Sequence, residues 1–197
     1  MERARLRHLA LETGLAVEAG GFVFLRDPQA GTQNQAQFES LLRQLPAASP
    51  TGDGWLCLAT GGTSGTLRFA RHDEKTLGAA AAGFTARYGC SQVNALDVLP
   101  AHHVSGFMTR IRSAETNGEH VVSTWKDLQA GFWPDLPPRT DGWFLSLVPT
   151  QLQRLLASPL AVERLRPLGG VEAGIGKVLL CAAETGLPRR ASPPRYR

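Results

Sequence analysis

The chain has 197 residues, of which 43% are hydrophobic and 19% are charged. This length suits one substantial domain, and this composition excludes a disordered tail, which could not bury a core. No apolar run reaches the roughly 18 residues that a spanning helix needs, and the first residues lack the apolar stretch of a signal peptide. We therefore expect a cytoplasmic protein without membrane segments.

The formal net charge of +4 is concentrated at the two ends of the chain. Three arginines lie in the first seven residues and four lie in the last nine, which leaves the interior slightly negative. A nucleic-acid-binding surface needs basic residues gathered on the folded domain, so we expect no nucleic-acid partner. We expect a domain over residues 1–188 and a poorly ordered basic tail over residues 189–197.

Apolar and β-branched runs alternate with segments of helical period, which predicts an α/β fold of strands joined by crossover helices. Strands are predicted at Gly21–Arg26, Trp55–Ala59, Leu67–Arg71, Val93–Leu99, His120–Ser123 and Trp143–Val148. Helices are predicted at Gln35–Leu45, Glu74–Tyr88, Val104–Ala114 and Gln151–Leu156, with a further one near Glu172–Glu184. Asp73 suits an N-cap and Gly89 a C-cap, so the second helix is bounded most clearly. Prolines predict loops over Pro46–Gly54 and Gly131–Asp141.

Three cysteines, Cys57, Cys90 and Cys181, are widely spaced among apolar residues. An odd number at such spacing fits packed, reduced thiols better than disulfides or a zinc site. His8, His72 and His120 have no metal-ligand spacing relative to the pair His102–His103. We therefore expect no resident metal bound by the protein alone.

A run of Gly, Ser and Thr follows the strand predicted at Trp55–Ala59. Thr60, Gly61, Gly62, Thr63, Ser64 and Gly65 lead into Arg68 at the start of the next strand. Glycines let the backbone approach phosphates closely, hydroxyls donate to phosphate oxygens, and an arginine neutralises their charge. The segment therefore suits a phosphate-binding loop, although a hairpin turn has a similar composition.

A second candidate follows the strand predicted at Val93–Leu99, where His102 and His103 precede a helix. Ligands of open α/β sheets bind outside the carboxyl ends of the strands, which is where these imidazoles lie. A helix cap or a surface pair explains two adjacent histidines equally well. No Ser-His-Asp or Cys-His order can be defined from their positions.

These segments resemble, in order, motifs of the acyl-adenylate-forming superfamily of AMP-binding synthetases and CoA ligases. They are most similar to o-succinylbenzoate-CoA ligases of menaquinone and phylloquinone biosynthesis. The family loop has the form Thr-Ser-Gly-Thr-Thr-Gly-x-Pro-Lys-Gly, in which Gly61 here replaces Ser, Ser64 replaces Thr, and Leu67-Arg68-Phe69 replaces Pro-Lys-Gly. His103–Gly106 is similar to the family's His-x-x-Gly, and Val148–Thr150 is similar to the segment before a pocket-lining helix.

The resemblance implies ATP-dependent adenylation of a carboxylate, followed by transfer of the acyl group to CoA, with Mg²⁺ accompanying the ATP. It implies phosphate binding by residues 60–65 and Arg68, and a catalytic role for Arg68 and His103. It implies an acyl-substrate pocket that includes His103, Gly106 and Thr150. Gly169 and Gly170 are similar to a family turn beside the adenine, without its Ala-Pro pair.

Other motifs of the superfamily are not found in this sequence. These are a Tyr-Gly-x-Thr-Glu segment, an Asp that binds the ribose, and a Lys in a C-terminal domain. We therefore expect an incomplete ligase whose adenylation is slower by orders of magnitude, since single electrostatic groups contribute about 10² to 10³ in rate. The alternatives are a nucleotide- or carboxylate-binding module, a subunit completed by a partner chain or a second copy, and a remnant with no ligand.

Overall fold

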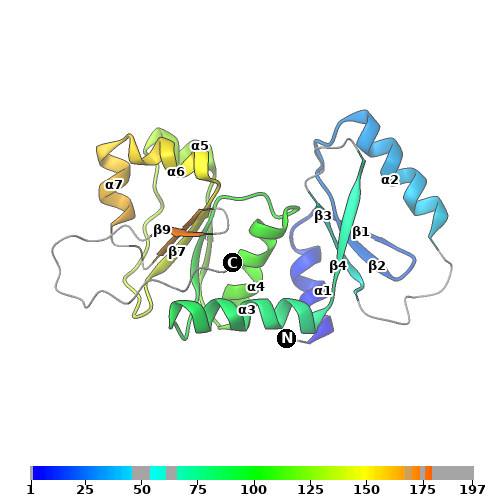
Figure 1. The fold of residues 1–197 in the computed structure, drawn as a ribbon, viewed down its shortest axis with the longest axis horizontal. Helices are drawn as coiled ribbons and strands as arrows, with labels where there is room; N and C mark the ends of the chain where they lie inside the picture. Colours follow the sequence, from blue (N-terminus) through cyan, green and yellow to red (C-terminus); the bar gives the residue numbers. More distant parts are fainter. Residues whose placement is uncertain are drawn as a thin grey trace, which may run out of the picture.

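A computed structural model of the protein describes residues 2–45, 54–60, 66–166, 168, 170–173 and 176–178. These residues form two β-sheets with helices around and between them, which confirms the α/β class (Figure 1). The helices are α1 (Arg3–Leu11), α2 (Thr32–Gln44), α3 (Glu74–Tyr88), α4 (Val104–Glu115), α5 (Trp125–Ala130), α6 (Pro149–Leu156) and α7 (Pro159–Leu165). The strands are β1 (Ala16–Ala19), β2 (Phe22–Leu25), β3 (Leu56–Thr60), β4 (Arg68–His72), β5 (Asn94–Asp97), β6 (His120–Val122), β7 (Trp143–Leu147), β8 (Gly170–Ala173) and β9 (Gly176–Val178). None of the helices within these ranges is long and apolar enough to cross a membrane.

The first sheet has the strand order β1-β2-β3-β4. Strands β2 and β3 are parallel and are joined through α2, while β1-β2 and β3-β4 are antiparallel pairs. Side chains of β2 alternate between the two faces of the sheet. Phe24 packs against Phe38 of α2 with ring centroids 5.5 Å apart, whereas Val23 and Leu25 join a core shared with α1 and α4. Both faces of this sheet are therefore covered by helices.

The second sheet has the order β6-β5-β7-β8-β9, in which only the last pair is antiparallel. Its parallel strands need crossovers, and the chain supplies α4 between β5 and β6, α5 between β6 and β7, and α6 with α7 between β7 and β8. Strands β5 and β7 are buried along their whole length, as parallel strands covered on both faces usually are. Their carboxyl ends point toward the start of α4 and the start of α6, where a ligand site is expected.

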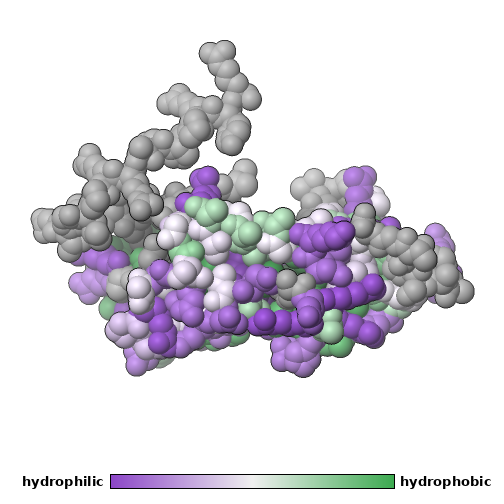
Figure 2. Space-filling view, turned by 90° about the horizontal axis from the view of Figure 1, so that it is seen from below, coloured by the Kyte–Doolittle hydropathy of each residue, from purple (hydrophilic) through white to green (hydrophobic). Residues whose placement is uncertain are grey.

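Helices α3 and α4 pack against both sheets. Leu77 of α3 belongs to the core of the first sheet, while Phe84 packs edge-on against Phe144 of the second, with centroids 5.2 Å apart. Helix α3 runs below both sheets in Figure 1, and the face seen from that side in Figure 2 is predominantly hydrophilic. The predicted boundaries of α3 are confirmed, because the Asp73 carboxylate accepts the Thr76 N–H at 2.8 Å and Gly89 ends the helix at φ 63°.

Most of the predicted elements are confirmed, with ends shifted by a few residues. The helix expected near Glu172–Glu184 is wrong over the described residues, where β8 and β9 form instead. Apolar spacing alone does not separate a short buried strand from a helix, and here pairing with β7 decides for a strand. Helices α1, α5 and α7 and strand β1 were not predicted, since each is short or has mixed polarity. The loop expected over Gly131–Asp141 contains no helix or strand.

Two sequence predictions fall largely outside the described residues. Residues 46–53 of the first expected loop and the basic tail over 189–197 both lie there, as does Cys181. Cys57 is buried and free, as predicted, and burial raises the pKa of its thiol to about 11. Cys90 is half-buried and also forms no disulfide. The described thiols are therefore packed rather than crosslinked.

Candidate functional site

The ends of β3 and β5 come together although they lie about 40 residues apart in the sequence. Ala59, next to the end of β3, forms a parallel β-bridge with His103, the N-cap residue of α4. The backbone of His103 is held by two further bonds: its N–H donates to Pro100 O at 3.0 Å, and its carbonyl accepts the Phe107 N–H at 2.9 Å. This arrangement places His103 beside Thr60, the first residue of the predicted phosphate-binding loop.

The predicted loop residues Gly61, Gly62, Thr63, Ser64 and Gly65 lie outside the described residues. Its two anchors are described: Thr60 pairs with Arg68 across the antiparallel strands β3 and β4, and the Thr60 hydroxyl donates to the Arg68 carbonyl at 3.2 Å. Arg68 is exposed and lies on the same face of β4 as Ala70 and His72, because side chains alternate along a strand. Arg68 therefore lies on the face of β4 whose Ala70 and His72 line the cavity described next.

A cavity of about 660 Å³ lies at the carboxyl ends of β3 and β5, and we call it the strand-end cavity. Its wall includes Thr60, His72, His103, Ser105 and Gln151, contributed by β3, β4, α4 and α6. Burial lowers the pKa of His72, so this imidazole is neutral near pH 7. Its Nε2 is buried and makes no hydrogen bond with any described atom. The cavity thus brings together the two segments that the sequence singled out separately.

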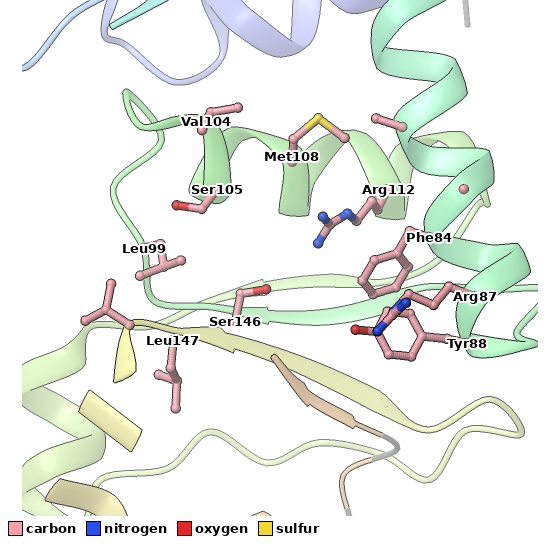
Figure 3. A pocket seen from close by; sticks show the side chains of 13 residues that line it. Phe84, Arg87, Tyr88, Leu99, Val104, Ser105, Met108, Arg112, Ser146 and Leu147 are labelled. Atoms are coloured by element: carbon pink, nitrogen blue, oxygen red, sulfur yellow. The ribbon is translucent and has the colours of Figure 1, made fainter. Parts of the chain in front are cut away.

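A second cavity, of about 530 Å³, lies between α3, α4 and β7 (Figure 3), and we call it the interhelix cavity. It adjoins the strand-end cavity, because Leu99, Val104, Ser105 and Val148 line both. Its wall is mainly apolar. The two cavities together form an elongated space that begins beside Thr60 and His103 and ends between α3 and α4.

Polar groups gather at the far end of the interhelix cavity. The guanidinium of Arg112 stacks on the Phe84 ring at 4.1 Å from its centroid, and the Ser146 side chain faces it across the cavity in Figure 3. Arg87 and Tyr88 of α3 line the same end. A fixed cation in an apolar wall favours a ligand with an apolar body and an anionic group.

A buried acidic residue supports the start of α4. Asp97, at the end of β5, accepts the Leu99 N–H at 3.1 Å, and its other oxygen lies 3.1 Å from His120 Nε2 and 3.9 Å from Arg110 Nε. Asp97 is only 3% exposed, and these two basic groups compensate for its burial. The cluster ties β5, β6 and α4 together beneath the cavities. Sequence reasoning missed it, because the three residues come from separate segments.

Three other predicted substrate- and nucleotide-binding residues, Gly106, Thr150 and Gly170, do not line either cavity. Gly106 is buried, and a Cβ there would lie 2.4 Å from Pro100 O, so close packing of α4 accounts for this glycine. Thr150 is exposed on α6, while its neighbours Val148 and Gln151 face the cavities. Gly170 lies in β8 opposite Phe144. Gly169 lies outside the described residues.

Several cavity residues were not predicted, although helical spacing marks them. Val104, Ser105, Met108 and Arg112 occupy one face of α4, at positions i, i+1, i+4 and i+8. Ala80, Gly83, Phe84, Arg87 and Tyr88 occupy one face of α3 at similar spacing, with small residues that leave room. Such a face usually predicts core packing. Only the tertiary structure shows that these two faces line a cavity together with β7.

No protein-family model and no curated protein matches the chain. Solved structures that it resembles include an AMP-forming acyl-CoA synthetase/AMP-acid ligase II-like protein from Dyadobacter fermentans, at 23% identity and a TM-score of 0.48, covering 74% of this chain and 39% of that one. They also include o-succinylbenzoate coenzyme A synthetase from Bacillus subtilis in complex with AMP, at 17% identity and a TM-score of 0.45, covering 69% of this chain and 34% of that one. The chain therefore spans less than two fifths of either protein.

Proposed function

We propose that this chain forms the acid- and nucleotide-binding portion of an o-succinylbenzoate-CoA-ligase-like enzyme. The observation that carries the proposal is the shared cavity: Thr60, at the start of one family-like motif, and His103, at the start of the next, line the same space. Motifs that act on one reaction must converge on the reacting atoms, whereas unrelated turns need not. The order of the motifs is a property of the sequence, whereas their convergence on one cavity is a property of the fold, so the two observations support the proposal independently.

The shape of the combined cavities supports an acid with two carboxylates. Arg112 lies seven residues beyond Ser105 on α4, which is about 10 Å along a helix at roughly 1.5 Å per residue. o-Succinylbenzoate carries one carboxylate on its aromatic ring and another at the end of a succinyl chain. We place the ring carboxylate at Arg112 and the succinyl carboxylate near Thr60 and His103, with apolar side chains such as Leu99 and Met108 around the body of the molecule.

The reaction at the strand-end cavity would proceed in two steps. An oxygen of the succinyl carboxylate attacks the α-phosphorus of ATP, an O–P bond forms, and the bond to pyrophosphate breaks. The thiol of CoA then attacks the acyl carbon, loses its proton, and displaces AMP. Residues 60–65 and Arg68 would hold the phosphates, so that their charge is neutralised while the carboxylate is aligned for attack.

Mg²⁺ would add positive charge at the phosphates. The residues of the chain fit an ion that enters the site already bound to ATP. Within the described ranges, no group of three or more His, Cys, Asp or Glu residues could hold a metal ion. The hydroxyl oxygens of Thr60, Thr63 and Ser64 are of the hard oxygen type that Mg²⁺ prefers as ligands, alongside phosphate oxygens. The protein contribution is therefore to orient the acid and the phosphates.

Calorimetry with o-succinylbenzoate, ATP and AMP tests the proposal. Arg112→Met should weaken o-succinylbenzoate binding about 10- to 100-fold, because a charged hydrogen bond contributes roughly 1.5–3 kcal/mol. Arg112→Lys should retain part of the affinity. Arg154→Met, at an exposed position of α6, is the matched control and should bind like the wild type. An analogue without the ring carboxylate should bind wild type and Arg112→Met equally.

Nucleotide binding needs a separate variant. Combined Ser64→Ala and Arg68→Ala should abolish ATP and AMP binding without affecting the acid. ATP–pyrophosphate exchange in the presence of o-succinylbenzoate then separates a binding module, which shows none, from an enzyme. A wild-type chain that binds neither the acid nor the nucleotide would refute the proposal and favour a remnant without ligand.

A further inference from the structure

His102, the other member of the histidine pair, lies outside the proposed ligand cavities. It is buried, with 8% of its surface exposed, whereas the neighbouring His103 is exposed to the strand-end cavity. His102 lines a separate small cavity of about 160 Å³ beneath α2, which His103 and Thr60 also border. His103, together with Ala59 and Thr60, therefore lies between the two cavities, and the His102 ring contacts the His103 ring.

Asp27, in the loop between β2 and α2, faces His102 from the first sheet. Its Oδ2 lies 3.9 Å from His102 Nε2, which is too long for a hydrogen bond but close for a charge interaction. The carboxylate is itself held in place, because Oδ1 accepts the Gln29 N–H at 2.8 Å. One oxygen thus anchors the side chain to its own loop, and the other is directed at the imidazole.

The ring of His103 lies against the ring of His102. The two imidazoles lie 4.3 Å apart between centroids, at an interplanar angle of 48°. The backbone of His103 is fixed by its bridge to Ala59. Its ring, by contrast, shows no hydrogen bond with any residue that the structure describes, and the ring of His102 is the aromatic ring that contacts it.

We infer that Asp27 and His102 are positioning residues for His103: the carboxylate holds the buried imidazole, which holds the ring that lines the strand-end cavity. The consequence for ligand binding rests on the function proposed above. Burial lowers the pKa of His102, and proximity to His103 lowers it further, while Asp27 opposes both. Arg26 is the remaining charged residue that borders the small cavity. A neutral His102 restrains His103 without repelling it when His103 is protonated.

NMR of the histidine ring protons in the ligand-free protein tests the positioning directly. The chain has five histidines, so each ring signal can be assigned by single substitution. Asp27→Asn should shift the ring signals of both His102 and His103 and lower the titration midpoint of His102, since the carboxylate favours the protonated form. Asp27→Glu should restore most of the wild-type signals. Asp135→Asn, in an exposed loop, is the control and should change neither.

Substitutions of His102 distinguish the contribution of ring packing from that of its charge to the orientation of His103. His102→Phe keeps a flat ring against His103 and should preserve its signal better than His102→Ala, which removes the ring. An unchanged His103 ring signal in both Asp27→Asn and His102→Ala would overturn the inference.

Ligand affinity gives a second readout. We expect both Asp27→Asn and His102→Ala to weaken o-succinylbenzoate binding several-fold. The melting temperature of Asp27→Asn should stay unchanged, and Asp27→Glu should recover the affinity. Affinity that is unchanged in these variants would contradict the inference while leaving the proposed function intact. Absence of binding by the wild type would instead refute the proposed function, and the NMR result would still decide the positioning.

Discussion

Gly106→Ala is expected to destabilise the protein, although alanine is the better helix former. A Cβ at this position of α4 would lie 2.4 Å from Pro100 O and 2.8 Å from Leu99 O, about an ångström short of ordinary contact. These atoms are backbone carbonyls of a tight turn, so relief requires α4 itself to move. Overpacking costs about 1–3 kcal/mol, and two rigid backbone neighbours at this distance place the change in the upper part of that range, at about 2–3 kcal/mol. The helix preference of alanine over glycine offsets roughly 1 kcal/mol of it.

The net expectation is a loss of about 1–2 kcal/mol in the free energy of unfolding, which for a chain of this size lowers the melting temperature by roughly 2–8 °C. Gly78→Ala in α3 is the matched control, because nothing lies within 4 Å of the added Cβ. It should gain up to about 1 kcal/mol from helix propensity alone. Urea and thermal unfolding of the two variants should therefore change in opposite directions.

A Gly106→Ala protein as stable as the wild type would refute the close packing of α4 on the Leu99–Pro100 turn. If stability were retained and only o-succinylbenzoate binding were lost, Gly106 would line the ligand site, as its motif implies. A joint loss of stability and binding fits the structure, because a displaced α4 moves both His103 and Arg112.

Three further outcomes follow from burial. Leu96→Ala, at a fully buried position of β5, should cost about 2–5 kcal/mol in urea unfolding, and a loss below about 1 kcal/mol would contradict the packing of the second core. Burial raises the pKa of Cys57 to about 11, so its thiol should resist alkylation at about pH 8 until the protein unfolds; rapid labelling of the native state would show that it is accessible. Burial lowers the pKa of His72 and His102 from 6.5, so the unfolded chain binds more protons below that pH. Unfolding free energy should therefore fall as the pH decreases from about 6.5 toward the folded pKa values. A flat profile between about pH 7 and 5 would argue against lowered pKa values for the half-buried His72 and the buried His102.

Local signals in the sequence determined the fold class and the limits of its best-defined helix. The side chain of Asp73 accepts a hydrogen bond from a backbone N–H three residues ahead, and Gly89 ends the helix in a left-handed conformation that glycine adopts without strain. Such interactions span a few residues, so they are visible without knowledge of the rest of the chain. The same holds for the proline-rich loop at Gly131–Asp141.

Contacts between distant segments decided the rest. Residues 170–173 form a strand because β7 offers them a pairing edge. Thr60 and His103 share a cavity because β3 bridges the start of α4. Arg112 becomes a candidate ligand contact because residues of α3, α4 and β7 line one cavity. The sequence by itself determined which residues favour each local conformation, and only the tertiary structure decided which of them meet, because burial and pairing depend on the whole chain at once.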